Sequence, residues 1–298
     1  MHISGNELRG HLAMLAFSGL VAGSFALGVK VANDITPAAF TLLRFVIAVS
    51  ILATVLLIKT EFTKKVFKAP WRFFVLGGCI AIYFVLMFEG LKIASSVSLA
   101  AVFTFAPLLS GLFGYILVRQ KMSLSIFTAL IIGAIGALWV VFEGNFQRLI
   151  MLEFGLGEMI FFCGVVFHAL YTPLSRKLNR GESPLGFAFA TTLGATVLMI
   201  FYGIGDVYQT DLLNLSWMVW LTLFYTALFA SALTFFLIQY ATLVLPSSKV
   251  MAYTYLVPSW ALMWELGLGQ NISIYNIGLG ILLTIFALVI LLWAPEGV

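Results

Sequence analysis

Ten apolar runs, each about as long as a membrane-spanning helix, follow one another along almost the whole sequence. A hydrocarbon core about 30 Å thick requires about 20 consecutive apolar residues of helix. Transmembrane sheets close instead into barrels of alternating segments about ten residues long, and this sequence has no such segments. The pattern therefore predicts an all-α polytopic membrane protein. The expected spans are residues 10–30, 36–58, 71–91, 95–118, 124–142, 155–175, 184–204, 217–239, 247–268 and 274–294.

The composition excludes the main classes of soluble protein. Of the 298 residues, 62% are apolar and 9% are charged, whereas soluble domains are close to half apolar and a quarter charged. A water-soluble fold of this composition would expose far more apolar surface than such folds do. An ordinary soluble enzyme, a disordered chain and a nucleic-acid-binding protein are therefore excluded. The short gaps between the spans leave no room for a folded domain outside the membrane.

The lysines and arginines predict how the chain is oriented in the membrane. With ten spans, 11 of the 16 cations fall on the side of the N-terminus and three on the opposite side. The remaining two, Arg44 and Lys249, lie within a span or at its edge. Because cytoplasmic loops retain such cations, we expect both termini in the cytoplasm and a multi-pass protein of the cell (inner) membrane.

The two halves of the chain resemble each other weakly, and a mid-span proline occupies corresponding places in them. The segment from Ser98 to Pro107 in the fourth span parallels the segment from Lys249 to Pro258 in the ninth. Since five helices is an odd number, the second half must enter the membrane from the opposite face, as in many secondary transporters. We expect two inverted five-helix repeats, residues 1–148 and 149–298.

The paired prolines also suggest where a substrate would bind. A proline inside a helix removes one hydrogen bond and kinks or breaks the helix. Matched interruptions in two repeats point to a substrate site at the repeat interface, although membrane helices also tolerate prolines that have no such role. We expect Pro107 and Pro258 to act in gating.

The sequence resembles the EamA-type carriers of the drug/metabolite transporter superfamily over essentially its whole length. The carriers resembled have ten helices in two inverted five-helix repeats and export or exchange small metabolites, amino acids among them. Pro107 and Pro258 match the paired prolines of the family, and Lys249 matches a basic residue nine positions before the second proline. The other matches are Thr36-Pro37, Arg44-Phe45, Gly90-Leu91-Lys92, Ser95-Ser96, Gly133 and Gly136.

The sequence departs from the family pattern where acidic residues are common. Family members often carry a Gly-Glu pair shortly after each proline helix, and this sequence reads Arg119-Gln120 and Gly269-Gln270 there. An acidic residue often found just before the second proline is Val257 here. The coupling or gating role of those carboxylates in the family therefore does not carry over, and neither does a substrate.

Arg44, about eight residues inside the second span, is the first candidate for a substrate contact. A charged group inside a span costs a few kcal/mol, so it usually faces protein or a water-filled cavity. Arg44 is suited to bind an anionic substrate group such as a carboxylate. Alternatively it pairs with a carboxylate and locks the bundle, which is the interpretation we favour. The acidic residues considered as partners are Glu89, Glu158 and Glu265.

A second group of candidates lies on the ninth and sixth spans. Lys249, Tyr253 and Trp260 share one helix face and suit an amphipathic ligand with a negative end. Lys249 at the end of its span is also placed to reach lipid phosphates. His168 is suited to relay protons, or it is a hydrogen-bonded structural histidine. The complete set of expected substrate contacts is Arg44, Tyr83, Thr104, His168, Lys249, Tyr253 and Trp260.

These observations favour a secondary transporter, an exporter or facilitator, for small organic metabolites such as amino acids. We expect alternating access through a central cavity between the two repeats. The alternatives are an intramembrane lipid or acyl transferase, which would need clustered Asp, His or Glu, and a structural membrane subunit. The sequence has no Walker loop, no His-Glu-x-x-His and no Gly-x-Ser-x-Gly, so we expect no catalytic residue, metal or cofactor. The expected partners are the metabolite and the lipid bilayer, without nucleic acid.

Overall fold

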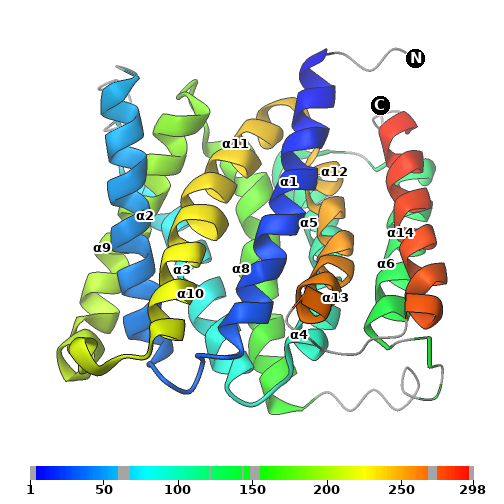
Figure 1. Ribbon diagram of the computed structural model, residues 1–298. Coiled ribbons are helices and arrows are strands. Elements are labelled where there is room, and N and C mark those ends of the chain that lie inside the picture. Colours follow the sequence, from blue (N-terminus) through cyan, green and yellow to red (C-terminus); the bar gives the residue numbers. More distant parts are fainter. Residues whose placement is uncertain are drawn as a thin grey trace.

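The computed structural model describes residues 5–59, 68–120, 122–142, 144, 145, 147, 155–267 and 274–294. Within these residues the helices run up and down a single bundle (Figure 1). Eight helical segments are long and apolar enough to cross a membrane. All ten predicted spans fall on helices, although the expected boundary between residues 148 and 149 lies outside the described residues.

The helices of the first half coincide closely with the first five predicted spans, and those of the second half with the last five. The first half contains α1 (Gly5–Gly28), α2 (Pro37–Ile58), α3 (Trp71–Leu91), α4 (Ser96–Phe103), α5 (Ala106–Val118) and α6 (Leu124–Val141). The second half contains α8 (Leu156–Leu178), α9 (Pro184–Gln209), η2 (Leu212–Asn214), α10 (Trp217–Ala227), η3 (Leu228–Leu233), α11 (Thr234–Val244), α12 (Ser247–Ala252), η4 (Tyr253–Leu256), α13 (Val257–Gly267) and α14 (Ile274–Trp293).

Several helices begin where a small hydroxyl residue can cap them. At each of these starts, the side-chain oxygen accepts a hydrogen bond from the backbone N–H three residues later. Such a cap satisfies a donor that has no partner within the helix. In α2 and α9 a proline follows the cap directly, where its missing N–H costs nothing. The capping residues are Thr36, Ser95, Ser123, Ser183 and Ser216.

Three spans are interrupted, and two of the interruptions were expected. The fourth span breaks between α4 and α5, and Pro107 lies in the first turn of α5. The ninth span passes through the 3₁₀ turn η4, and Pro258 is the second residue of α13. The third interruption is η3, a π-helical segment between α10 and α11 in the eighth span. It contains no proline, so the sequence pattern did not indicate it.

The closest helix packing joins helices of different halves. In Figure 1, α6 lies beside α14 at one edge of the bundle, and α2 lies beside α9 at the other. A Cβ atom added to Gly136 would lie 2.8 Å from the carbonyl oxygen of Gly280, and one added to Gly280 would lie 2.6 Å from that of Gly136. Only glycine permits this approach, because small residues let membrane helices touch along their backbones.

The start of α1 and the end of α14 lie at the same end of the bundle (Figure 1), as an even number of spans requires. Arg9 in α1, Lys59 after α2 and Arg176 in α8 belong to the same end. The assignment of this end to the cytoplasm stays a prediction from the cations. Four of the cations that enter this prediction lie outside the described residues: Lys64, Lys65, Lys121 and Arg148.

Candidate functional site

The centre of the bundle holds a small cavity where helices of both halves meet. It lies between α1 and α3 of the first half and α8, η3 and α11 of the second. We call this space the central cavity. Most of its lining is apolar, and its polar side chains are Ser24, Tyr83, His168, Tyr171 and Thr234.

The central cavity is almost closed in this structure. Its volume is about 10 Å³, and a space of that size holds at most about one water molecule. The open cavity expected between the repeats is therefore not present in the form that the structure describes. Aromatic rings crowd this part of the bundle: Phe17, Phe84 and Phe235 line the cavity, and the ring of Phe103 in α4 packs against those of Tyr83 and His168, with centroid distances of 5.9 Å and 5.2 Å.

Tyr83 and His168, which the sequence predicted as substrate contacts, do come together in the cavity wall. Their ring centroids lie 4.4 Å apart. Both residues are buried, and neither the Tyr83 hydroxyl nor the Nδ1 atom of His168 has a hydrogen-bond partner. The Ser24 hydroxyl in the same wall is also buried without one. Because buried polar groups in proteins are nearly always hydrogen-bonded, the centre holds hydrogen-bonding capacity that no described residue satisfies.

Arg44 lies beside this cavity and is fully buried. Its Nε atom donates to the Ser231 hydroxyl at 2.5 Å, and its Nη2 atom donates to the Ala230 carbonyl at 2.6 Å. The guanidinium carbon also lies 3.6 Å from the centroid of the Phe84 ring. Phe84 and Ala230 also line the central cavity, so Arg44 lies directly behind part of the cavity wall.

The favoured prediction that Arg44 pairs with an acidic residue is wrong for two of the three partners considered. Glu89 in the last turn of α3 pairs with Lys92 at 3.1 Å. Glu158 in the first turn of α8 accepts a hydrogen bond from Ser98. Both carboxylates lie at helix ends and have nearer partners, whereas Arg44 lies two turns inside α2. The side chain of Glu265 lies outside the described residues.

The candidates on the ninth span lie elsewhere. The Tyr253 hydroxyl is 3.0 Å from the Nδ1 atom of His11, and the Trp260 indole donates to the Ser18 hydroxyl at 3.1 Å. These bonds tie the ninth span to α1, and neither Tyr253 nor Trp260 lines the central cavity. Their role in substrate binding stays a prediction.

Lys249 and Thr104 also lie outside the lining of the central cavity. Lys249 is buried and donates to the Ala294 carbonyl at 2.7 Å, which is at the end of α14. Thr104 lies at the break between α4 and α5, where its hydroxyl donates to the Ala101 carbonyl at 2.6 Å. It directly follows Phe103, whose ring packs against Tyr83 and His168 of the cavity wall. Of the predicted substrate contacts, Tyr83 and His168 therefore line the central cavity together and Arg44 lies beside it. The other four, Thr104, Lys249, Tyr253 and Trp260, do not line this cavity.

Sequence reasoning missed Ser24, Tyr171 and Ser231. Tyr171 is three residues after His168 and therefore shares its helix face, so helical periodicity would have found it. Ser24 and Ser231 are single hydroxyl residues in apolar runs, and nothing in their neighbourhood distinguishes them. Among the described residues, no three His, Cys, Asp or Glu side chains gather in an arrangement that would hold a metal ion.

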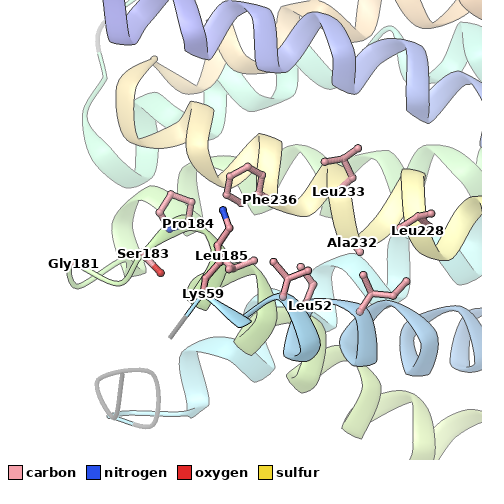
Figure 2. Close-up of a pocket in the computed structure, with 12 residues that line it drawn as sticks. Leu52, Lys59, Gly181, Ser183, Pro184, Leu185, Leu228, Ala232, Leu233 and Phe236 are labelled. Carbon is pink, nitrogen blue, oxygen red and sulfur yellow. The ribbon is translucent and has the colours of Figure 1, made fainter. Parts of the chain in front are cut away.

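A much larger hollow lies on the other side of η3. It is a groove of about 680 Å³ between α2, the start of α9, η3 and α11, and Figure 2 shows its lining residues. Leu52, Leu185 and Phe236 give it an apolar wall, and Lys59 lies at one end. The sequence did not predict this groove, because residues of α2 form it together with segments more than 120 positions later in the chain.

A buried ion pair holds the end of the bundle where the cations gather. Arg72 at the start of α3 pairs with Glu182, in the turn before α9, at 2.7 Å. Arg72 also donates to the carbonyl of Leu178 at 2.5 Å, and Glu182 accepts from the backbone N–H of Arg180 at 2.6 Å. Burial alone would raise the pKa of the Glu182 carboxyl, but these hydrogen bonds and the Arg72 charge outweigh it and lower the pKa.

The sequence profile of the EamA-like transporter family matches residues 8–142 and again residues 155–293. The chain belongs to the EamA-like transporter family. It is a membrane transporter with two EamA halves and not an enzyme, so the alternative of an intramembrane transferase is excluded.

A curated transporter agrees with this assignment, and a solved structure shares the fold. The uncharacterized transporter YyaM of Bacillus subtilis (strain 168) is 24% identical over 269 residues, which cover 90% of this chain and 88% of that protein. A solved crystal structure with 18% sequence identity superposes with a TM-score of 0.74, covering 97% of this chain and 96% of the other. The structural likeness shows that the EamA-like transporter shares that fold.

Proposed function

We propose that this EamA-like transporter is a secondary carrier, an exporter or facilitator, of small organic metabolites such as amino acids. The observation that carries the proposal is the central cavity. Helices of both halves line it, and buried polar atoms of Ser24, Tyr83 and His168 have no partner there. An inert core would bury apolar side chains at this place, since an unsatisfied polar group costs about 1–3 kcal/mol.

Alternating access requires the nearly closed centre to open toward one face at a time. Phe103 covers the rings of Tyr83 and His168, and it is the last residue of α4, next to the break before α5. A tilt of α4 about this break would move Phe103 and open the central cavity. Pro107 and Pro258 start the helices that follow the two breaks, which supports their proposed role in gating.

We propose further that the end of the bundle with Lys59 and Arg72 faces the cytoplasm, in the cell membrane. In a variant without Cys79 and Cys163, single cysteines at two exposed positions test this orientation. Asn214 in η2 and Arg180 before α9 lie at opposite ends of the bundle. A membrane-impermeant maleimide added to intact cells should label the cysteine at position 214 and spare the one at position 180. The reverse pattern would invert the topology.

Transport itself is tested with purified protein in liposomes loaded with amino acids and related metabolites, with and without a pH gradient. At least one compound should leave faster than from protein-free vesicles, and the proposal fails if none does. Tyr83→Phe removes one unsatisfied hydroxyl from the cavity wall and should slow transport about 3- to 10-fold, the equivalent of one hydrogen bond. The matched control is Tyr208→Phe, because Tyr208 is exposed on α9.

A further inference from the structure

Arg44 is a buried cation for which the described part of the chain supplies no anion. The two ion pairs between described residues are Arg72 with Glu182 and Lys92 with Glu89. Arg44 is fully buried, and its Nη1 atom has no hydrogen-bond partner. A buried charge in a membrane protein is costly, so it is normally paired or serves a substrate or ion pathway. Among the described residues, the ion pair that would offset this cost is missing.

The groups that hold Arg44 are all neutral. They are the Ser231 hydroxyl, the Ala230 carbonyl and the Phe84 ring. Ala230 and Ser231 belong to η3, whose π-helical turn loosens the regular hydrogen-bond ladder of the eighth span. The backbone carbonyl and the hydroxyl there accept from Arg44 as a substitute for a carboxylate. Segments of this kind occur often at functional sites.

The Arg44 guanidinium is close to the wall of the central cavity. Phe84 and Ala230 contact Arg44 and also line that cavity. The unpartnered hydroxyl of Tyr83 lies in the same wall. An anion in the enlarged cavity would therefore find a planar fork of N–H donors on one side and a hydroxyl donor on the other. Arginine suits this task because its fork matches the two oxygens of a carboxylate.

We infer that the substrate of this transporter carries an anionic group such as a carboxylate, and that Arg44 binds this group at the edge of the central cavity. The inference rests on the proposed carrier function and adds the substrate's charge. When the anion binds, Arg44 exchanges its contacts with Ser231 and Ala230 for the substrate. The exchange frees η3 from Arg44, so substrate binding is coupled to the conformation of the eighth span.

The experiment compares the standard amino acids with their carboxamides as efflux probes in proteoliposomes. The two series have the same side chains and amino groups, and they differ in the charge of the carboxyl group. An amino acid that moves should lose about 10-fold or more of its rate as the amide, the equivalent of one charged hydrogen bond. Equal rates for an amino acid and its amide overturn the inference and leave the carrier function intact. Movement of neither series overturns both.

Variants then test whether Arg44 causes the preference for the amino acid over its amide. Arg44→Gln should move an amino acid and its amide at equal rates, Arg44→Lys should keep part of the preference, and the exposed Arg180→Gln should keep all of it. Ser231→Ala leaves the charge in place and removes a competing acceptor, so the KM of the amino acid should fall about threefold. If Ser231→Ala raises the KM for acid and amide alike, Arg44 serves to hold η3 and the inference is wrong.

Discussion

Replacing Glu182 by glutamine removes the negative half of the buried ion pair and leaves Arg72 where it is. The two side chains are 0% and 1% exposed, so solvent cannot take over the role of the carboxylate. Arg72 keeps its hydrogen bonds to the carbonyls of Leu178, Lys68 and Ala69, at 2.5, 2.8 and 3.2 Å. These groups are neutral, and the guanidinium becomes a buried charge without a counterion.

The expected cost follows from the burial of the pair. Removing one partner of a buried pair typically costs about 3–5 kcal/mol. At about 2 °C per kcal/mol for a chain of this size, the midpoint of thermal unfolding should fall by about 6–10 °C. The exposed pair of Glu89 and Lys92 provides a matched control, because both of its side chains are 38% exposed. Glu89→Gln should therefore cost less than about 1 kcal/mol.

Thermal unfolding of the detergent-solubilised protein measures both variants, and a double variant isolates the pair. Arg72→Met combined with Glu182→Met removes both charges at once and should be more stable than either single variant. If Glu182→Gln shifts the midpoint no more than Glu89→Gln does, the buried pair contributes nothing particular and the reasoning fails.

The pH dependence of the stability difference provides an independent check, because the direction of its change is fixed by the pKa of Glu182. The pKa of the Glu182 carboxyl in the folded protein is below its ordinary value near 4.5. A carboxyl with a lowered pKa contributes stability that is fully present above the ordinary value and is lost as the pH falls through the lowered one. Wild type and Glu182→Gln should therefore differ equally at pH 8 and pH 6, and the difference should shrink only in acid below about pH 4.5.

Two further predictions concern the packing between the halves. Gly280→Leu should cost about 1–3 kcal/mol or more in thermal stability, because even a Cβ atom there lies 2.6 Å from a carbonyl of α6. Gly278→Leu on the same helix meets nothing within 4 Å and should change little, and equal effects would refute the close contact. Trp260→Phe removes the hydrogen bond between the ninth span and α1 and should cost about 1 kcal/mol. Trp293→Phe, at an exposed position, is its control, and a similar loss there would contradict the assignment.

Run length and helix-breaking residues predicted most of the fold. Each predicted span falls on helix because an apolar run of that length has one stable form in a bilayer. The breaks near Pro107 and Pro258 followed from the chemistry of proline. The π-helical η3 was not predictable, since its residue types form ordinary helices elsewhere and its hydrogen bonds with Arg44 depend on the tertiary arrangement.

The candidate site was predicted only in part, because periodicity shows which residues share a face and not what that face meets. Tyr253 and Trp260 do share a face, and that face meets α1 instead of the central cavity. Arg44 was identified from its charge, but its partner Ser231 is 187 positions away. Such a pairing depends on how the two halves pack against each other, and that packing cannot be predicted from a single sequence.

The glycine contact between α6 and α14 bears on which parts of the transporter can move. One of these helices comes from each half of the sequence, and their backbones touch at Gly136 and Gly280. A rocking motion of one half against the other would have to pull these backbones apart during every cycle. In the proposed cycle, the stationary scaffold would therefore include helices from both halves, and the moving parts would be the spans broken near Pro107 and Pro258, α4–α5 and α12–α13. The boundary between the two EamA halves would then differ from the boundary between the stationary and the moving helices.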